Sequence, residues 1–78
     1  MNKQATVFQM TRSEQETENE ANRLTTQVEA ALATVALRSP EEADSLESAA
    51  DRIERAARDL ATALRGLAQE RKATKDQS

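Results

Sequence analysis

Large apolar residues recur at every seventh position in the second half of the chain, at Leu46, Ile53, Leu60 and Leu67. Three positions after each of the first three stands an alanine, giving a parallel row of Ala49, Ala56 and Ala63. Alternating steps of three and four residues place both rows on one face of an α-helix, which is the pattern of a coiled-coil seam. Alanine adds little bulk, so a second helix can approach closely along this face. The pattern predicts a helix that packs against another helix.

The first half of the chain carries a similar stripe, which consists of Ala21, Leu24, Val28, Ala31 and Val35, with Leu32 beside it. These steps predict an amphipathic helix, with Gln27 on its polar face. Two overlapping capping-box signals precede the stripe, Thr11 with Glu14 and Ser13 with Glu16. We therefore expect the first helix to begin near residue 13.

The run Ser39-Pro40-Glu41-Glu42 separates the two stripes and is a specific helix-start signal, with a hydroxyl cap and a proline at the first helical position. Such a short connection makes the helices antiparallel neighbours. The expected fold is all-α, an antiparallel two-helix hairpin over residues 13–71. Its helices are expected at about 13–38 and 40–71, between a flexible arm at 1–12 and a flexible polar tail at 72–78.

The hairpin leaves apolar surface without a partner, because Ala50, Ala57, Leu64 and Ala68 flank the seam of the second helix. A chain of 78 residues is near the size at which a single core is marginal. We therefore expect a homo-oligomer, in the simplest case two hairpins that form a four-helix bundle. The residues expected at a partner or dimer interface are Phe8, Met10, Leu46, Ala49, Ile53, Ala56, Leu60, Ala63, Leu64 and Leu67.

Catalytic, metal-binding and cofactor-binding signatures are absent from the sequence. The chain has no His and no Cys, so thiol nucleophiles, the commonest general base and the two commonest structural zinc ligands are missing. We expect no enzymatic activity, no metal and no cofactor. No apolar run reaches the ~20 residues that a membrane-spanning helix needs. A cytoplasmic protein without a membrane partner is expected, although export by a route without a cleaved leader stays open.

The charges favour a protein partner over a nucleic acid. The net charge is −3, and residues 1–50 hold nine acids and four bases, whereas residues 51–78 hold five acids and seven bases. An acidic half disfavours general attraction to phosphates. The arginines of the second helix, Arg52, Arg55, Arg58 and Arg65, leave a nucleic-acid-binding hairpin open as an alternative. The interleaved pairs Asp51 with Arg55 and Glu54 with Arg58 favour a solvated, salt-bridged face instead.

A second alternative comes from a resemblance. The stretch Gln27-Val28-Glu29-Ala30-Ala31-Leu32, leading to Ser39-Pro40, is similar to the segment that enters the hairpin turn of type III secretion needle subunits. This resemblance implies a structural or secreted assembly subunit. The polar end of the chain, residues 72–78, departs from the buried apolar helix with which such subunits end. The shape also resembles small secretion chaperones and plasmid RNA-binding hairpin dimers.

The function expected from the sequence is therefore that of a non-enzymatic protein-protein interaction module, a small adaptor, regulator or chaperone. Its partner would be held by apolar helix surface, as a helix lies in a groove. Leu60, Leu64 and Leu67 are the candidates on the second helix. Phe8 and Met10 are candidates on the arm, where they either fold back over Leu64 and Leu67 or dock into a partner.

Overall fold

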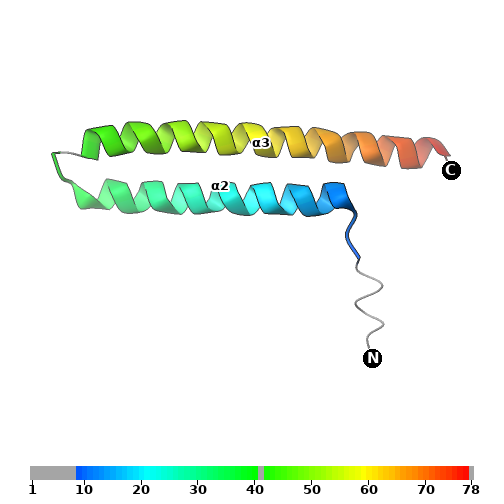
Figure 1. Cartoon of the computed structure of the whole chain (residues 1–78), viewed down its shortest axis with the longest axis horizontal. Coiled ribbons are helices and arrows are strands. Elements are labelled where there is room, and N and C mark those ends of the chain that lie inside the picture. The colour runs from blue at the N-terminus through cyan, green and yellow to red at the C-terminus, as the bar shows by residue number, and fades with distance from the viewer. Residues whose placement is uncertain (1–8, 41, 78) are drawn as a thin grey trace, which may run out of the picture.

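The chain forms a helical hairpin. The computed structural model describes residues 9–40 and 42–77, with side chains described up to residue 74. Helix α2 spans Arg12–Leu37 and helix α3 spans Glu42–Gln77, and these described ranges contain no strand. The two helices lie side by side and run in opposite directions (Figure 1). The all-α antiparallel hairpin expected from the sequence is confirmed, while the four-helix bundle stays a prediction.

The start of α2 uses one of the two overlapping capping signals. The Thr11 hydroxyl accepts a hydrogen bond from the Glu14 N–H at 3.1 Å, and the Glu14 carboxylate accepts one from the Thr11 N–H at 3.0 Å. This reciprocal pair is a capping box, and it satisfies two donors that the first helical turn would otherwise leave open. Thr11 is therefore the N-cap. Met10 lies just before it, whereas Phe8 lies outside the described residues.

The turn between the helices is short, and Arg38 within it has a left-handed conformation. Arg38 caps the end of α2 with φ 55° and ψ 39°, a conformation that glycine adopts most readily. Beyond it, the Ser39 N–H donates to the Glu42 carboxylate at 2.7 Å, and the Glu42 N–H donates to the Ser39 carbonyl at 3.0 Å. The first described residue of α3 is Glu42, two positions after Pro40, where the sequence placed the helix start. Glu41 lies outside the described residues.

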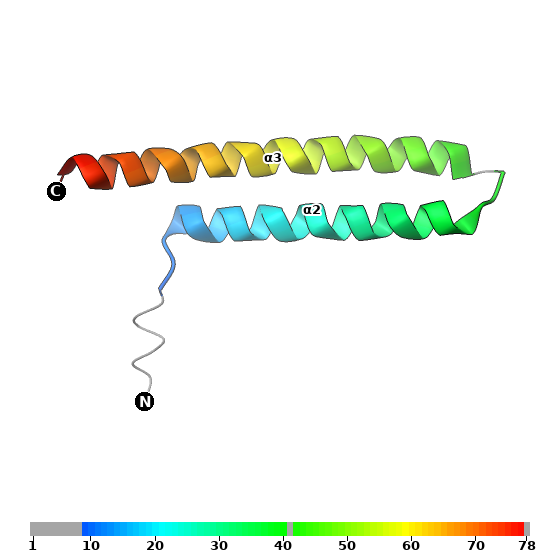
Figure 2. The same cartoon turned by 180° about the vertical axis from the view of Figure 1, so that it is seen from behind.

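Helix α3 is the longer element and continues to Gln77, whereas the sequence suggested an end near residue 71 and a polar tail beyond it. It projects past the beginning of α2, as both face-on views show (Figures 1 and 2). Two features account for the extension. Gly66 lies in open surroundings and causes no break. The run that follows it, residues 68–72, consists of residues that favour helix.

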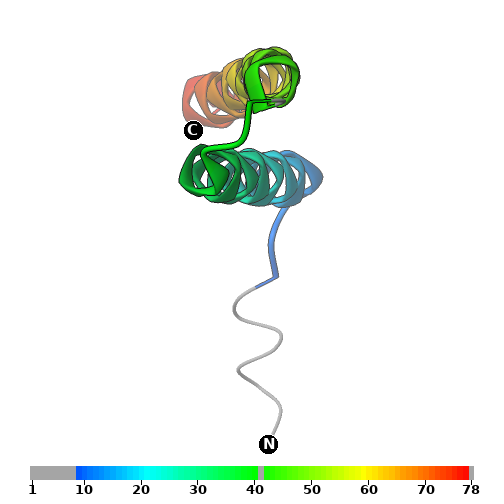
Figure 3. The ribbon, with the colours of Figure 1, turned by 90° about the vertical axis from the view of Figure 1, so that its left-hand side faces the viewer.

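The alanine row forms the closest part of the helix contact. Ala49 and Ala56 are the buried residues of the described chain, only 4% and 3% exposed, and Ala63 is half-buried. The large row, Leu46, Ile53, Leu60 and Leu67, is half-buried as well. Seen end-on, the two helices form a single pair that crosses at a shallow angle (Figure 3). This arrangement is that of an antiparallel coiled coil.

A close contact between the helices shows their relative register. The Thr17 hydroxyl lies 3.4 Å from the Ala63 carbonyl oxygen, so these two residues are level. The helices are antiparallel, so a step of seven residues forward along α2 matches a step of seven backward along α3. Leu24 is therefore level with Ala56, and Ala31 is level with Ala49. A second half-buried row of α2 alternates with this one and consists of Glu20, Gln27 and Thr34. The seam of α2 is thus partly polar.

This register corrects the stripe expected on the first helix. Val28, Leu32 and Val35 were expected in it, yet all three are exposed, while Gln27, expected on the polar face, is half-buried in the seam. The apolar residues of α2 occupy adjacent heptad positions, and one partner helix covers only part of so wide a stripe. The α2 residues left over lie beside the seam and stay exposed.

Candidate interaction surface

The two long sides of the hairpin differ in chemistry: one is mostly apolar and the other is charged. An ion pair at one end of the apolar side shows which residues of the two helices belong to it. Arg71 of α3 donates from Nη2 to Oε2 of Glu14 on α2 at 2.9 Å. Both residues flank the seam, so they mark one side of the hairpin. Heptad steps from this pair give three further facing pairs on the same side. These are Ala21 with Leu64, Val28 with Ala57, and Val35 with Ala50, and together they are called the apolar strip below.

The larger members of the apolar strip are well exposed. Val28 is 40% exposed, Val35 is 54% exposed and Leu64 is 48% exposed. Leu32 lies on the same face of α2, one turn from both valines, and is 64% exposed. Ala50 and Ala57 are exposed too, while Ala21 is half-buried. Four sizeable aliphatic side chains therefore lie uncovered on one side of the hairpin. By contrast, the buried residues of the described chain are two alanines.

A charged pair closes the apolar strip at the open end of the hairpin. Glu14 uses one carboxylate oxygen for the Thr11 N–H and the other for Arg71. The hydrogen bond from the Thr11 backbone, and next the one from Arg71, lower the pKa of the Glu14 carboxyl below its ordinary value. The Thr11 hydroxyl also donates to the Glu70 carboxylate at 3.2 Å. These contacts tie the start of α2 to α3.

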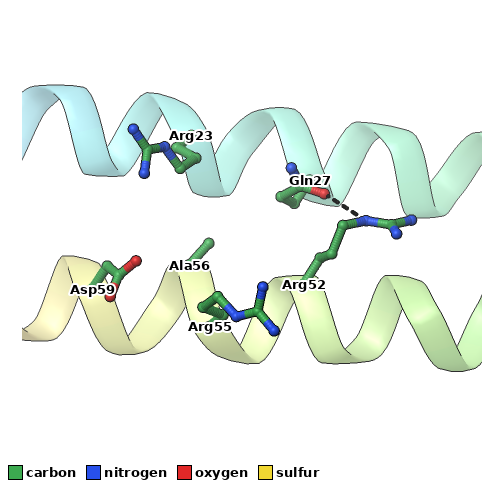
Figure 4. A pocket seen from close by; sticks show the side chains of 6 residues that line it. All are labelled: Arg23, Gln27, Arg52, Arg55, Ala56 and Asp59. Carbon is green, nitrogen blue, oxygen red and sulfur yellow. Dashed lines mark hydrogen bonds between the residues drawn. The ribbon is translucent and has the colours of Figure 1, made fainter.

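The opposite side of the hairpin is charged and holds two open clefts. The first has a volume of about 240 Å³ and is lined by Arg23, Gln27, Arg52, Arg55, Ala56 and Asp59. Figure 4 shows Arg23 and Gln27 on α2 and the other four on α3, with the Arg52 Nε donating to the Gln27 Oε1 at 3.2 Å. Three guanidinium groups and a single carboxylate give this cleft a positive balance.

The second cleft lies beside the first and is acidic. It has a volume of about 340 Å³, and its lining residues are Glu16, Glu20, Asp59, Thr62 and Ala63. Oε1 of Glu20 is buried and accepts no hydrogen bond, and its cationic neighbour is Nη1 of Arg23 at 3.6 Å. The charged side therefore carries a basic region and an acidic region next to each other.

The arginines of α3 are arranged differently from the sequence expectation. Ion pairs within 4.0 Å in the described chain join Arg12 to Glu16, Arg23 to Glu20 and Arg71 to Glu14. The expected partners Asp51 with Arg55 and Glu54 with Arg58 are not among them. Arg52 and Arg55 instead line the basic cleft, because the close approach of α2 brings Arg23 and Gln27 beside them.

The residues expected at an interface divide into three groups. Seven lie along the seam with α2, namely Leu46, Ala49, Ile53, Ala56, Leu60, Ala63 and Leu67. Leu64 and Met10 are exposed, and Phe8 lies outside the described residues. Sequence reasoning did not assign Val28, Leu32 and Val35 to an interface, because it placed them in the seam. The presence of apolar residues at adjacent heptad positions was the signal that could have identified them.

Neither metal-binding nor membrane-spanning features occur in the part of the chain that the structure describes. Within these residues, no three acidic side chains gather as a metal site would require, and neither helix combines the length and apolarity needed to cross a membrane. No known protein family, curated protein or solved structure gives a significant match to this chain.

Proposed function

We propose that this chain is a protein-protein interaction module that acts through binding and not through catalysis. The observation that carries the proposal is the uncovered apolar strip, with Leu32 beside it. Val28, Leu32 and Val35 project from three successive turns of α2, and Leu64 projects from α3 on the same side. Contiguous apolar surface of this kind on a small protein is typical of an interaction site.

The energetics of a small hairpin support the same proposal. Full burial of a Val or Leu side chain contributes about 1.5–3 kcal/mol relative to exposure. Here the buried described residues are Ala49 and Ala56, and the large residues of the seam are only half-buried. Covering Val28, Leu32, Val35 and Leu64 therefore adds substantially to the stability of the hairpin. A partner protein is the means by which such side chains leave water.

The strip also indicates the chemistry of the partner. Its surface is aliphatic and two helices wide, and its described part contains no aromatic anchor. A helical partner with an aliphatic stripe of its own matches this surface, since helices interlock through ridges and grooves of such side chains. The proposed roles are those of an adaptor, a small regulator or a chaperone.

Single cysteines test the proposal, because the natural chain contains none. Val28→Cys places a thiol on the apolar strip, and Ala36→Cys places one at another exposed position of α2, away from the strip. The rate of maleimide alkylation is measured for each folded variant in extract of the native cell. The rate for the same variant unfolded in denaturant serves as its reference. We expect the extract to slow alkylation of the Val28→Cys thiol at least tenfold relative to the Ala36→Cys thiol. Equal rates would refute the proposal.

A second candidate function follows from the basic cleft. Arg23, Arg52 and Arg55 come from two helices and meet in one place, which the sequence alone did not show. Guanidinium groups in such an arrangement suit phosphate groups of a nucleic acid. The adjacent Glu16 and Glu20 oppose long-range attraction. Retention on immobilised RNA that falls steeply with added salt and is lost in Arg52→Gln would favour this candidate over the first.

A further inference from the structure

On the basis of the proposed function, we infer that the partner covering the apolar strip is a second copy of this chain. The strip consists of three facing pairs, and every pair combines one larger and one smaller residue. On α3 the larger member is Leu64, opposite Ala21. On α2 the larger members are Val28 and Val35, opposite Ala57 and Ala50 of α3.

Twofold symmetry makes this pattern self-complementary. A second hairpin, related by a twofold axis parallel to the helices, sets α2 of one copy against α3 of the other at the same level. Val28 then meets Ala57 of the second copy, and Val35 meets its Ala50. Leu64 meets Ala21 in the same way. Larger side chains pack against alanines at every level, as close helix packing requires.

The charges at the end of the strip obey the same symmetry. Glu14 and Arg71 form an ion pair within one hairpin. The twofold rotation sets Glu14 of one copy against Arg71 of the other, so the two pairs become a network of alternating sign. The six residues of the strip are uncharged, and no like charges are forced together along it. An unrelated protein would need its own surface with the same order of large and small side chains and the same charges at one end.

The arrangement of the apolar residues in α2 points to the same geometry. Toward α3, the α2 seam alternates Thr17, Leu24 and Ala31 with the polar row Glu20, Gln27 and Thr34. The larger apolar residues left over, Val28 and Val35, occupy the heptad position beside the seam, on the side of the strip. One part of the apolar face of α2 therefore contacts α3, and the other part is available to a further helix. Helices of four-helix bundles have faces of this width because each contacts two neighbours.

The available area suits a dimer of this kind. The 26 residues of α2 extend over about 39 Å, and two helices side by side are about 20 Å wide. The face shared by the two helices thus has an area on the order of 800 Å². A standard protein interface buries about 800 Å² on each partner. The strip lies within this face, between Val35 at the turn and Glu14 at the open end.

Sedimentation equilibrium of the full chain and of charge variants tests the inference. We expect the natural chain to have twice its 8.6 kDa chain mass at micromolar concentration. Val28→Glu and Ala57→Lys each place charges in the proposed interface, so each alone should weaken dimerisation by on the order of 100-fold. An equimolar mixture of the two should recover the dimer mass, because one contact between the copies becomes an ion pair. Ala36→Glu, a matched change away from the strip, should stay a dimer.

Several results would overturn the inference. These are a natural chain that remains at 8.6 kDa across the concentration range, variants that dimerise as well as the natural chain, or a mixture with no recovery. Circular dichroism of each sample reports whether helix is lost, and recovery of both helix and mass in the mixture excludes simple misfolding. The alkylation experiment separates the two proposals. A monomeric purified chain whose Val28→Cys thiol is still protected in cell extract would overturn the second copy and leave a different protein as the partner.

Discussion

The hydroxyl of Thr17 on α2 lies 3.4 Å from the carbonyl oxygen of Ala63 on α3, so a side chain of one helix reaches the main chain of the other. The same hydroxyl lies 2.9 Å from the Ser13 carbonyl oxygen of its own helix. Such an approach is possible because Ala63 carries only a methyl group. The alanine row therefore sets both the spacing and the register of the hairpin.

Enlarging the alanine row should destabilise the hairpin. Ala56 is 3% exposed and lies level with Leu24, so Ala56→Leu forces additional methyl groups into a filled contact. We expect a loss of about 1–3 kcal/mol in the free energy of unfolding. Ala73→Leu is the matched control, since Ala73 is exposed near the end of α3. Chemical denaturation at one fixed protein concentration measures both, and equal stabilities would contradict the role given to Ala56.

Removing the carboxylate of Glu20 should stabilise the chain. Its Oε1 is buried without a hydrogen-bond donor, and Glu20 belongs to the seam row that faces α3. A buried acceptor without a hydrogen bond costs about 1–3 kcal/mol. The contact of the same oxygen with the exposed Arg23 guanidinium at 3.6 Å offsets only part of this cost, because exposed ion pairs contribute little. Glu20→Leu is therefore expected to raise the free energy of unfolding by about 1 kcal/mol. Glu18→Leu removes the same charge from an exposed position two residues away. A stabilisation as large in Glu18→Leu would show that net charge, not burial, is responsible.

The Glu14 carboxyl should make stability dependent on pH. Its pKa is lower in the folded chain, owing first to the Thr11 backbone hydrogen bond and then to Arg71. Its contribution is therefore present above the ordinary carboxyl pKa of about 4.3, and it is lost as the pH falls through the folded value. Glu14→Gln keeps an oxygen for the cap but does not ionise.

We expect the difference in unfolding free energy between the natural chain and Glu14→Gln to shrink as the pH is lowered from about 6 to about 3. Thermal or urea unfolding across this range measures it. A constant difference would mean that the ionised form of Glu14 has no special partners in the fold.

The turn offers a position where glycine should be an improvement. Arg38 has φ 55°, a left-handed conformation that disfavours residues with a Cβ. Arg38→Gly is expected to raise the free energy of unfolding by about 0.5–1 kcal/mol, because it relieves this strain. Ala36→Gly, two residues earlier and inside α2, should lower it by a similar amount. Destabilisation by both changes would indicate that the Arg38 side chain contributes more than its backbone strain costs.

Local signals in the sequence predicted the hairpin well. The capping residues Thr11 and Glu14 and the turn at Ser39 and Pro40 depend on short-range hydrogen bonds and backbone geometry, which a sequence displays directly. The alanine row of α3 was also identifiable, because small residues at a seven-residue interval are typical of a close contact between helices. These features determine where the helices begin and which face of α3 is used.

The face that α2 presents could not be predicted in the same way. Val28 and Gln27 are neighbours in the sequence, and either could be turned toward α3 by a small rotation of the helix. The choice depends on packing against Ile53 and Ala56 and on the Arg52 to Gln27 hydrogen bond, which join segments far apart in the chain. Periodicity places residues on a helix, but the partner helix decides which of them are covered.

The hairpin and its proposed dimer together require that Ala56 faces α2 of its own chain while Val28 faces outward. Methyl NOEs in a sample that mixes isotope-labelled and unlabelled chains measure both relations at once. We expect NOEs between the Ala56 and Leu24 methyl groups within one chain, and NOEs from Val28 to Ala57 between chains. An Ala56 methyl that contacts only the other chain, or a Val28 methyl in contact with Ile53 of its own chain, would contradict this arrangement.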